Sequence, residues 1–156
     1  MLRCIVSAIC GTSRLDKGEV ETIAWKDCVP FVPPIKTGYV IKVYDGDTIT
    51  IAGRLPYPES PLYRFQVRLL GIDSPEIKGK TDKEKEAAHK SQHALESLVL
   101  NKTVLLREIS TEKYGRILAN VYLVTDTEEL LVNKWMLANG HAVPYDGTVN
   151  YDDGGN

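Results

Sequence analysis

The stretch Phe65-Gln66-Val67-Arg68-Leu69-Leu70-Gly71-Ile72-Asp73-Ser74-Pro75-Glu76 joins an apolar run to a cluster of charged residues. The apolar run predicts a β-strand over 65–72, and Pro75 marks its end because proline cannot donate a ladder hydrogen bond. Side chains alternate along a strand, so Arg68 is expected to share one face with Ile72. The strand is the third in the chain and anchors the fold prediction.

Arg68 is unusual because it lies within an otherwise apolar strand. A guanidinium in such a place needs an anionic partner, either a carboxylate or a bound phosphate. Asp73 and Glu76 flank the rigid Pro75 at the strand end, which keeps the two acids close together. They predict a charged site at this end of the strand; the alternative is that they only cap the following loop.

Segments on either side complete the fold prediction. β-branched and aromatic runs predict strands over 39–44, 48–51, 103–109 and 116–124. Apolar residues spaced three and four apart predict a helix over 87–99, with Asn101 as its left-handed terminus, and a short helix over 131–138. Five strands with a helix after the third predict a mainly β (α+β) fold, a five-stranded OB-type Greek-key barrel with two helices. Periodicity alone would also fit another small α+β domain.

Prolines divide the chain. Pro30, Pro33 and Pro34 precede the first barrel strand and indicate an extended connector. We therefore expect an N-terminal extension over 1–37, a barrel domain over 38–147 and a flexible acidic tail over 148–156. The extension holds two candidate short strands, over 4–9 and 20–25, and is a candidate binding segment for a protein partner.

Composition limits the class of protein. Of 156 residues, 43% are apolar and 26% charged, so wholesale disorder is excluded. The formal charge of −2 argues against a protein that coats nucleic acid electrostatically, but not against an enzyme that grips one or two phosphates. No run approaches the roughly 18 apolar residues of a membrane span. We expect a soluble intracellular protein without a signal peptide and with no membrane partner.

Cysteines and other candidate ligands carry less information. Cys4, Cys10 and Cys28 match no four-ligand zinc pattern and are expected to be thiols, the alternative being one bridge from Cys28 to Cys4 or Cys10. The histidines, His89, His93 and His141, form no ligand constellation. Two tryptophans, Trp25 and Trp135, are expected to be packing residues.

Two turns add further candidates. Asp45-Gly46-Asp47-Thr48 is either a hairpin corner or a turn that aims a carboxylate at a hard divalent cation. Lys113-Tyr114-Gly115-Arg116 is either a charged hairpin turn or the source of a second arginine for the phosphate that Arg68 would bind.

These three segments, in this order and spacing, resemble the staphylococcal nuclease (thermonuclease) family. The Asp-Gly-Asp-Thr turn, the strand end Arg-x-x-x-x-Asp-Ser-Pro-Glu and the Lys-Tyr-Gly-Arg turn all match, and the resemblance covers about 38–145. It implies a calcium-dependent nuclease that cleaves DNA or RNA and leaves 3′-phosphate ends, favouring single strands. The alternative is a catalytically idle barrel used as a nucleic-acid-binding or assembly module.

The resemblance also implies roles for single residues. Asp47 and Asp73 correspond to calcium-binding carboxylates, with the Ser74 carbonyl as a further ligand. Glu76 corresponds to the acid that positions or deprotonates the attacking water. Asp45 corresponds to an acid that stands near the metal without binding it.

The phosphate contacts follow in the same way. Arg68 and Arg116 correspond to the pair that clamps the scissile phosphate, and Lys113 and Tyr114 to contacts with the neighbouring phosphate. Tyr145 is a candidate for the tyrosine that stacks on the base. The acidic balance departs from the basic secreted relatives and predicts weaker non-specific affinity for nucleic acid. The family's third helix has no counterpart after Tyr145, and residues 1–37 are expected to replace its cover.

Overall fold

A computed structural model describes residues 23–77, 81–125 and 128–146. The chain divides into two units, Met1–Pro30 and Phe31–Asn156. The strand expected over 4–9 and the tail over 148–156 lie outside the described residues, as do Cys4 and Cys10. Cys28 is an exposed free thiol.

The described part of the first unit corrects two expectations. A 3₁₀ helix, η1 (Trp25–Asp27), occupies the end of the strand that was expected over 20–25. The Asp27 carboxylate accepts a hydrogen bond from the Ala24 N–H at 2.9 Å, which closes one helical turn instead of an extended segment. Trp25 is 95% exposed in this turn, so the expectation that it packs in a core is wrong.

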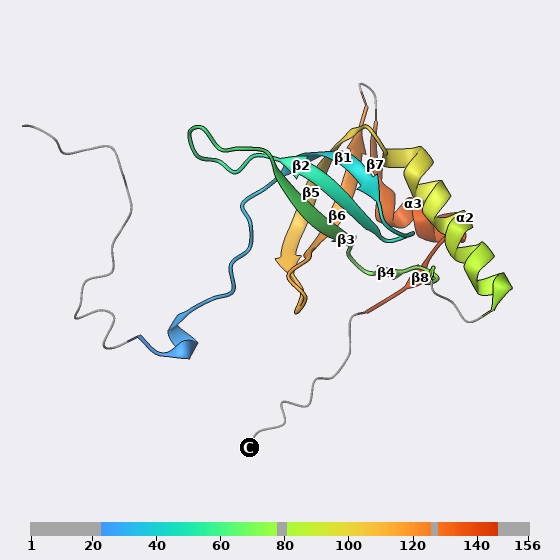
Figure 1. The fold of residues 1–156 in the computed structure, drawn as a ribbon, viewed down its shortest axis with the longest axis horizontal. Coiled ribbons are helices and arrows are strands. Elements are labelled where there is room, and N and C mark those ends of the chain that lie inside the picture. The colour runs from blue at the N-terminus through green and yellow to red at the C-terminus, as the bar shows by residue number, and fades with distance from the viewer. Residues whose placement is uncertain (1–22, 78–80, 126–127, 147–156) are drawn as a thin grey trace, which may run out of the picture. The chain divides into compact units, whose positions relative to one another are not determined.

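Five strands of the second unit close into a barrel, which confirms the predicted OB-type fold (Figure 1). They are β1 (Thr37–Val43), β2 (Thr48–Gly53), β3 (Tyr63–Leu69), β5 (Thr103–Thr111) and β6 (Ile117–Val124). Neighbours pair in the order β3-β2-β1-β5-β6, all antiparallel, and a parallel pairing of β3 with β6 closes the ring. A sixth strand, β7 (Glu129–Leu131), adds to the free side of β6.

Inward side chains of the barrel form one apolar core. Val40, Ile51, Val67 and Val121 are each fully buried, and they come from four different strands. Ile35 also packs in this core, so the end of the proline-rich connector contributes to the barrel. Close packing of these branched side chains fixes which face of each strand points outward, and therefore which polar residues reach the barrel surface.

The third strand is shorter than predicted. β3 ends at Leu69, and a separate two-residue strand, β4 (Ile72–Asp73), follows. Gly71 has a φ of +75°, a left-handed conformation that breaks the strand between them. Ile72 is consequently buried in the core, whereas Arg68 points away from it, so the expectation that they share a face is wrong. The turn redirects the acidic segment across the barrel end.

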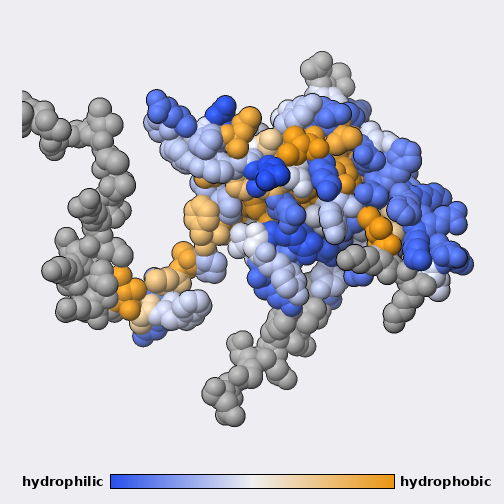
Figure 2. All heavy atoms as spheres, in the orientation of Figure 1, coloured by the Kyte–Doolittle hydropathy of each residue, from blue (hydrophilic) through white to orange (hydrophobic). Residues whose placement is uncertain are grey.

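Two helices follow the predicted pattern. α2 (Asp82–Val99) begins earlier than expected because Thr81 and Glu84 form a reciprocal capping box. Asn101 follows it with a φ of +59°, the predicted left-handed terminus. The helix buries Ala88, Ser91, Leu95 and Val99, and hydrophilic side chains gather over its outward side in Figure 2.

The second helix, α3 (Val132–Ala138), lies within one residue of its predicted bounds. Trp135 packs against the core, as expected, and stacks on His141 with ring centroids 5.7 Å apart. His89 and His93 lie exposed on α2. Among the described residues, no helix is both long and apolar enough to span a bilayer.

Gly46 allows the acidic turn between β1 and β2 to pack against α2. A Cβ at this position would lie 1.8 Å from the Ser91 Oγ and 2.8 Å from the Ser74 Cβ. Neither helix nor loop could approach the turn so closely if residue 46 carried a side chain. Glycine is therefore required here for packing, beyond its use in a hairpin corner.

Asn133 joins three elements at the closed end of the core. Its side-chain oxygen accepts a hydrogen bond from the Val121 N–H at 2.9 Å. Its amide nitrogen donates to the Leu70 carbonyl at 2.8 Å and to the Ala119 carbonyl at 3.3 Å. Sequence periodicity gave no indication of this buried network, which fixes the chain just beyond β3.

We expect Asn133→Leu to lower the free energy of unfolding by about 3 kcal/mol, since it leaves the buried Val121 N–H and Leu70 carbonyl unpaired. Urea denaturation measures the change. Lys134→Ala, at an exposed position of α3, is the control and should change the free energy by less than about 0.5 kcal/mol. Equal effects of the two substitutions would contradict the role given to Asn133.

Candidate active site

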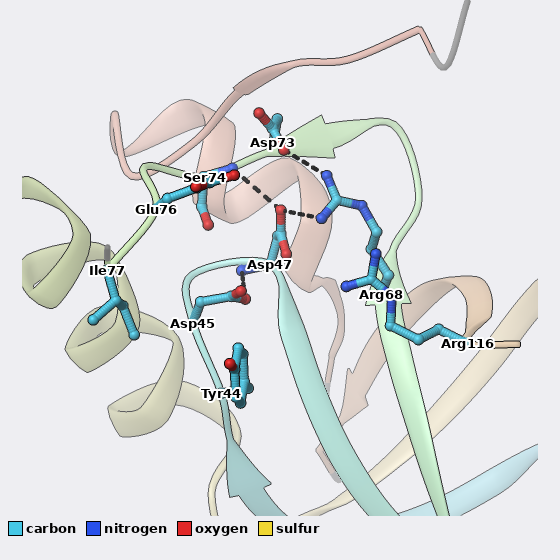
Figure 3. Close-up of a pocket in the computed structure, with 9 residues that line it drawn as sticks. All are labelled: Tyr44, Asp45, Asp47, Arg68, Asp73, Ser74, Glu76, Ile77 and Arg116. Carbon is cyan, nitrogen blue, oxygen red and sulfur yellow. Dashed lines mark hydrogen bonds and ion pairs between the residues drawn. The ribbon is translucent and has the colours of Figure 1, made fainter. Parts of the chain in front are cut away.

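A cavity of about 410 Å³ opens at the barrel end where β1, β3 and β4 terminate (Figure 3). Seven of the residues singled out from the sequence line it, together with Tyr44 and Ile77. The seven are Asp45, Asp47, Arg68, Asp73, Ser74, Glu76 and Arg116. Segments separated by up to 71 positions in the sequence thus meet in one place.

Arg68 bridges the two principal acids. Its Nη1 lies 2.8 Å from the Asp47 Oδ2, and its Nη2 lies 2.5 Å from the Asp73 Oδ1. Strand pairing explains the first contact, because Thr48 is the register partner of Arg68 and Asp47 precedes it. The turn at Gly71 brings Asp73 back over the guanidinium. One arginine therefore holds both acids that had been assigned to a cation.

Asp47 is the most deeply buried acid of the cavity, with a relative exposure of 2%. Its Oδ1 accepts a hydrogen bond from the Thr48 hydroxyl at 2.7 Å, and its Oδ2 accepts one from the Ser74 N–H at 3.2 Å. The backbone carbonyl accepts the Leu69 N–H at 2.8 Å. These contacts leave the carboxylate little freedom to rotate.

Burial raises the pKa of Asp47 to about 7, and the charge of the neighbouring Asp45 adds to this effect. The Thr48 hydroxyl and Arg68 oppose the rise without cancelling it. Desolvation disfavours the charged carboxylate, and a second acid nearby disfavours it further. Burial and Asp45 therefore outweigh the stabilisation that Arg68 and Thr48 give to the charged carboxylate.

Arg116 lies beside Arg68 in the cavity (Figure 3). It precedes Ile117, which pairs with Val67 where β3 and β6 close the barrel, so barrel closure places the two arginines together. Arg116 forms an ion pair through its Nε with the Glu112 carboxylate across the Glu112–Arg116 turn. That hydrogen bond raises the pKa of Arg116, and the guanidinium lines the cavity.

A second cavity of about 810 Å³ continues from the first and shares Arg68, Asp73, Glu76 and Arg116 with it. The remaining three predicted residues, Lys113, Tyr114 and Tyr145, line this second cavity. All ten residues predicted from the sequence are thus at the two cavities.

Tyr145 reaches the second cavity through a short strand pair. β8 (Val143–Pro144) pairs with β4, and the Tyr145 N–H donates to the Gly71 carbonyl at 3.0 Å. Its ring centroid lies 5.8 Å from the Arg68 guanidinium carbon. Tyr114 is 72% exposed, and the Lys113 Nζ lies 4.7 Å from its ring centroid. Two aromatic rings and a lysine therefore border the arginines on this side.

The donor set suits a hard cation in its chemistry. Asp47 and Asp73 offer carboxylate oxygens, which are the ligands that calcium prefers. The charged Asp47 carboxylate is disfavoured by its burial, and a nearby positive charge would favour it. Within the described ranges, however, no three acidic, histidine or cysteine side chains are already gathered as one cation site. Arg68 occupies the space between the two acids instead.

Three residues at the site were missed from the sequence. Glu112 was not singled out, although its position four residues before Arg116 could have indicated an ion pair across the turn. Thr48 was treated as part of a hairpin motif, and its hydroxyl proves to hold Asp47. Tyr44 was assigned to a strand, yet its half-exposed ring lines the first cavity.

Comparison with known proteins agrees with this arrangement. The sequence profile of the family described as staphylococcal nuclease homologue matches residues 66–154. A protein of Escherichia coli named as an uncharacterized endonuclease is 32% identical over 109 residues, covering 70% of this chain and 61% of the relative. A probable endonuclease of Yarrowia lipolytica is 30% identical over 136 residues, covering 76% of this chain and 59% of the relative.

An uncharacterized protein of Methanocaldococcus jannaschii is 31% identical over 128 residues, covering 69% of this chain and 58% of the relative. The matches thus span about three fifths of the length of these relatives. The family profile covers more than half of the present chain, including the strand end, the second turn and both helices. The chain belongs to the family of staphylococcal nuclease homologues.

Proposed function

We propose that this protein is a nuclease that hydrolyses phosphodiester bonds of DNA or RNA in a calcium-dependent reaction and leaves 3′-phosphate ends. The observation that carries the proposal is the single cavity that Arg68 and Arg116 line together with Asp47, Asp73 and Glu76. Membership of the nuclease homologue family and relatives named as endonucleases support it.

The two arginines suit a phosphodiester. Guanidinium groups bind phosphate oxygens through paired hydrogen bonds, and two of them reduce the repulsion that a phosphodiester anion presents to an incoming nucleophile. The negative charge on the phosphoryl oxygens grows in the transition state. Fixed positive groups therefore stabilise the transition state more than they stabilise the ground state. Glu112 fixes Arg116 and the barrel strand fixes Arg68, which reduces the reorganisation needed on binding.

Glu76 is the candidate general base. It lines both cavities and therefore faces the position of a phosphate held by the arginines. A carboxylate there can accept the proton of the attacking water, and such a positioned base contributes roughly 10²- to 10⁴-fold to a rate. The exposed tyrosine rings of the second cavity suit unstacked bases, which favours single-stranded substrates.

Asp47, Asp73 and the Ser74 carbonyl are the groups that would hold a calcium ion. When bound, the ion would supply positive charge that polarises the phosphoryl group and stabilises charge on its oxygens. Arg68 would then be released from the two acids to bind phosphate, while Asp45 would remain near the cation without binding it.

A second candidate function follows from the ion pairs themselves. Because Arg68 is satisfied by Asp47 and Asp73, the barrel is electrostatically complete without a ligand. A catalytically idle module that binds nucleic acid or assembles with a protein would keep the same pairs for stability. The two functions differ in whether Glu76 matters, since it has no part in those ion pairs.

We expect the protein to cleave single-stranded DNA or RNA with calcium and not with chelator, leaving ends that require phosphatase treatment before extension. Arg68→Ala should lower kcat/KM by about 10³-fold or more, and Glu76→Gln should lower kcat by about 10²-fold or more. Gel assays of 5′-labelled oligonucleotides measure both.

Matched controls are available on the same elements. Arg64 lies on β3 outside both cavities, and Glu86 is exposed on α2, so Arg64→Ala and Glu86→Gln are the control variants. Both should cleave like the unmodified protein. Absence of cleavage by folded protein, with binding of oligonucleotides retained, would favour the idle module.

Glu112 should affect the rate through Arg116. We expect Glu112→Ala to lower kcat about tenfold with little change in KM, because the guanidinium loses the hydrogen bond that orients it for the transition state. Glu112→Gln should lose less, since the amide oxygen still accepts from the Nε of Arg116. Steady-state kinetics separate kcat from KM, and Glu108→Ala on β5, which contacts Asn120 outside the cavities, is the control. A change confined to KM would contradict this role.

The raised pKa of Asp47 gives a pH dependence with a definite sign. Between its ordinary value of 3.8 and about 7, the folded state keeps a proton that the unfolded state has lost. The unfolding free energy of the metal-free protein should therefore fall as pH rises through this window, when it is measured relative to that of Asp47→Asn. The size of the pKa shift corresponds to a fall of a few kcal/mol. Above pH 7 the Asp47 carboxyl is ionised in both the folded and the unfolded state, so the unfolding free energy stays at its lowered value.

Urea denaturation in chelator at pH 4, 6 and 8 measures this difference. Added calcium at pH 8 should stabilise the unmodified protein more than Asp47→Asn, because ligand binding to the folded state raises its unfolding free energy. If calcium stabilises the two proteins equally, Asp47 is not a cation ligand.

A further inference from the structure

The two cavities leave the paired arginines in different directions. They share Arg68, Asp73, Glu76 and Arg116, which form the proposed phosphate site. The larger cavity continues to Lys113, Tyr114 and Tyr145, whereas the smaller one continues to Tyr44 and Ile77. The phosphate site is therefore open on two sides, and a strand bound across it would place nucleotides in both cavities.

Tyr44 is the aromatic residue of the smaller cavity. Its side chain is 52% exposed, and Figure 3 shows its ring at the edge of the cavity, beyond Asp45 and away from Asp73. A phenol ring that is half exposed next to a phosphate site resembles the stacking platforms of proteins that bind single-stranded nucleic acid. None of the roles considered so far uses this ring.

The backbone of Tyr44 is fixed at both of its polar groups. Its N–H donates to the Thr48 carbonyl at 2.9 Å, which closes the acidic turn. Its carbonyl accepts a hydrogen bond from the Gln92 side chain of α2, also at 2.9 Å. The ring is thus presented from a rigid segment next to Asp47, and little ordering is needed when a base stacks on it.

Positive charge accompanies the ring. Lys42, near the end of β1, places its Nζ 5.8 Å from the Tyr44 ring centroid and is exposed. An ammonium group beside a stacking ring can contact the phosphate of the same nucleotide. At the larger cavity, Lys113 and Tyr114 present the same combination, with a separation of 4.7 Å. The site is flanked by two similar lysine–tyrosine pairs.

We propose that Tyr44 and Lys42 form a second nucleotide subsite, which binds the base and phosphate on the side of the scissile bond opposite to Tyr114 and Tyr145. The proposal rests on the proposed nuclease function. It specifies the substrate as a chain with nucleotides on both sides of the cleaved bond, so that internal bonds are cleaved faster than terminal ones.

The test uses single-stranded oligonucleotides of one sequence in which a single abasic position is moved along the strand. Consider the nucleotide that would stack on Tyr44 when a given bond is cleaved. If this nucleotide lacks its base, the unmodified protein should cleave that bond about tenfold more slowly, which is the effect of one lost base stack. Tyr44→Ala should lower cleavage of the intact strand by the same factor and show no further loss at that position. Tyr44→Ala should still cleave more slowly when the abasic position lies on the other side of the bond.

Two variants sharpen this test. Tyr44→Phe keeps the stacking face and should restore the abasic profile that Tyr44→Ala loses. Tyr39→Ala is the matched control, since Tyr39 lies on β1, which leads to Tyr44, has a similar exposure of 45% and lines neither cavity. The subsite is overturned if Tyr44→Ala cleaves the intact strand as fast as Tyr39→Ala, or if its abasic profile equals that of the unmodified protein.

Binding separates this proposal from the proposed function. If the unmodified protein cleaves none of the strands, catalysis fails, and fluorescence anisotropy of a labelled octanucleotide in calcium still decides the subsite. Weaker binding by Tyr44→Ala than by Tyr39→Ala supports the subsite, and equal binding overturns it.

Discussion

The double contact of Arg68 with Asp47 and Asp73 is the interaction on which the site depends. A guanidinium within a barrel strand is stable only with anionic partners, and here the partners come from two separate turns. The contact requires Gly46, which lets the first turn pack against α2, and Gly71, whose left-handed conformation returns the chain over the arginine. Without either glycine the acids would not converge on one side chain.

Barrel closure supplies the rest of the site. The parallel pairing of β3 with β6 places Arg116 beside Arg68, although 48 positions separate them in the sequence. The short pairing of β4 with β8 brings Tyr145 to the same place, and Asn133 fixes the chain between β3 and β4. The fold therefore gathers the residues of the proposed phosphate site from strand ends, where polar side chains leave the apolar core.

Much of this could be predicted from the sequence because the information is local. Alternating apolar residues predict the strands, and the three motifs predict which residues share the barrel end. Strand 65–72 was predicted too long because a left-handed glycine cannot be distinguished from a strand glycine in one sequence. Glu112 and Tyr44 were missed because their importance depends on which cavity the folded strands enclose. The expectation that Trp25 packs in a core is wrong, because the residues next to it in the sequence do not determine whether its side chain is buried.

The arrangement also explains why cation and phosphate should act together. In the ligand-free protein, Arg68 neutralises acids that a cation would otherwise bind, while the pKa of Asp47 remains raised to about 7. A dication on the acids would free Arg68 for a phosphate, and a phosphate on the arginines would leave the acids to the dication. Binding of the two ligands is then thermodynamically coupled, and the coupling is reciprocal.

Calorimetric titration of calcium with and without a saturating nucleoside 3′,5′-bisphosphate measures this coupling most directly. The account predicts that the nucleotide tightens calcium binding at least about tenfold, a coupling of roughly 1.4 kcal/mol, and that calcium tightens the nucleotide by the same factor. Calcium binding that is undetectable, or whose affinity is the same with and without the nucleotide, would contradict the claim that Arg68, Asp47 and Asp73 form one phosphate- and metal-binding site.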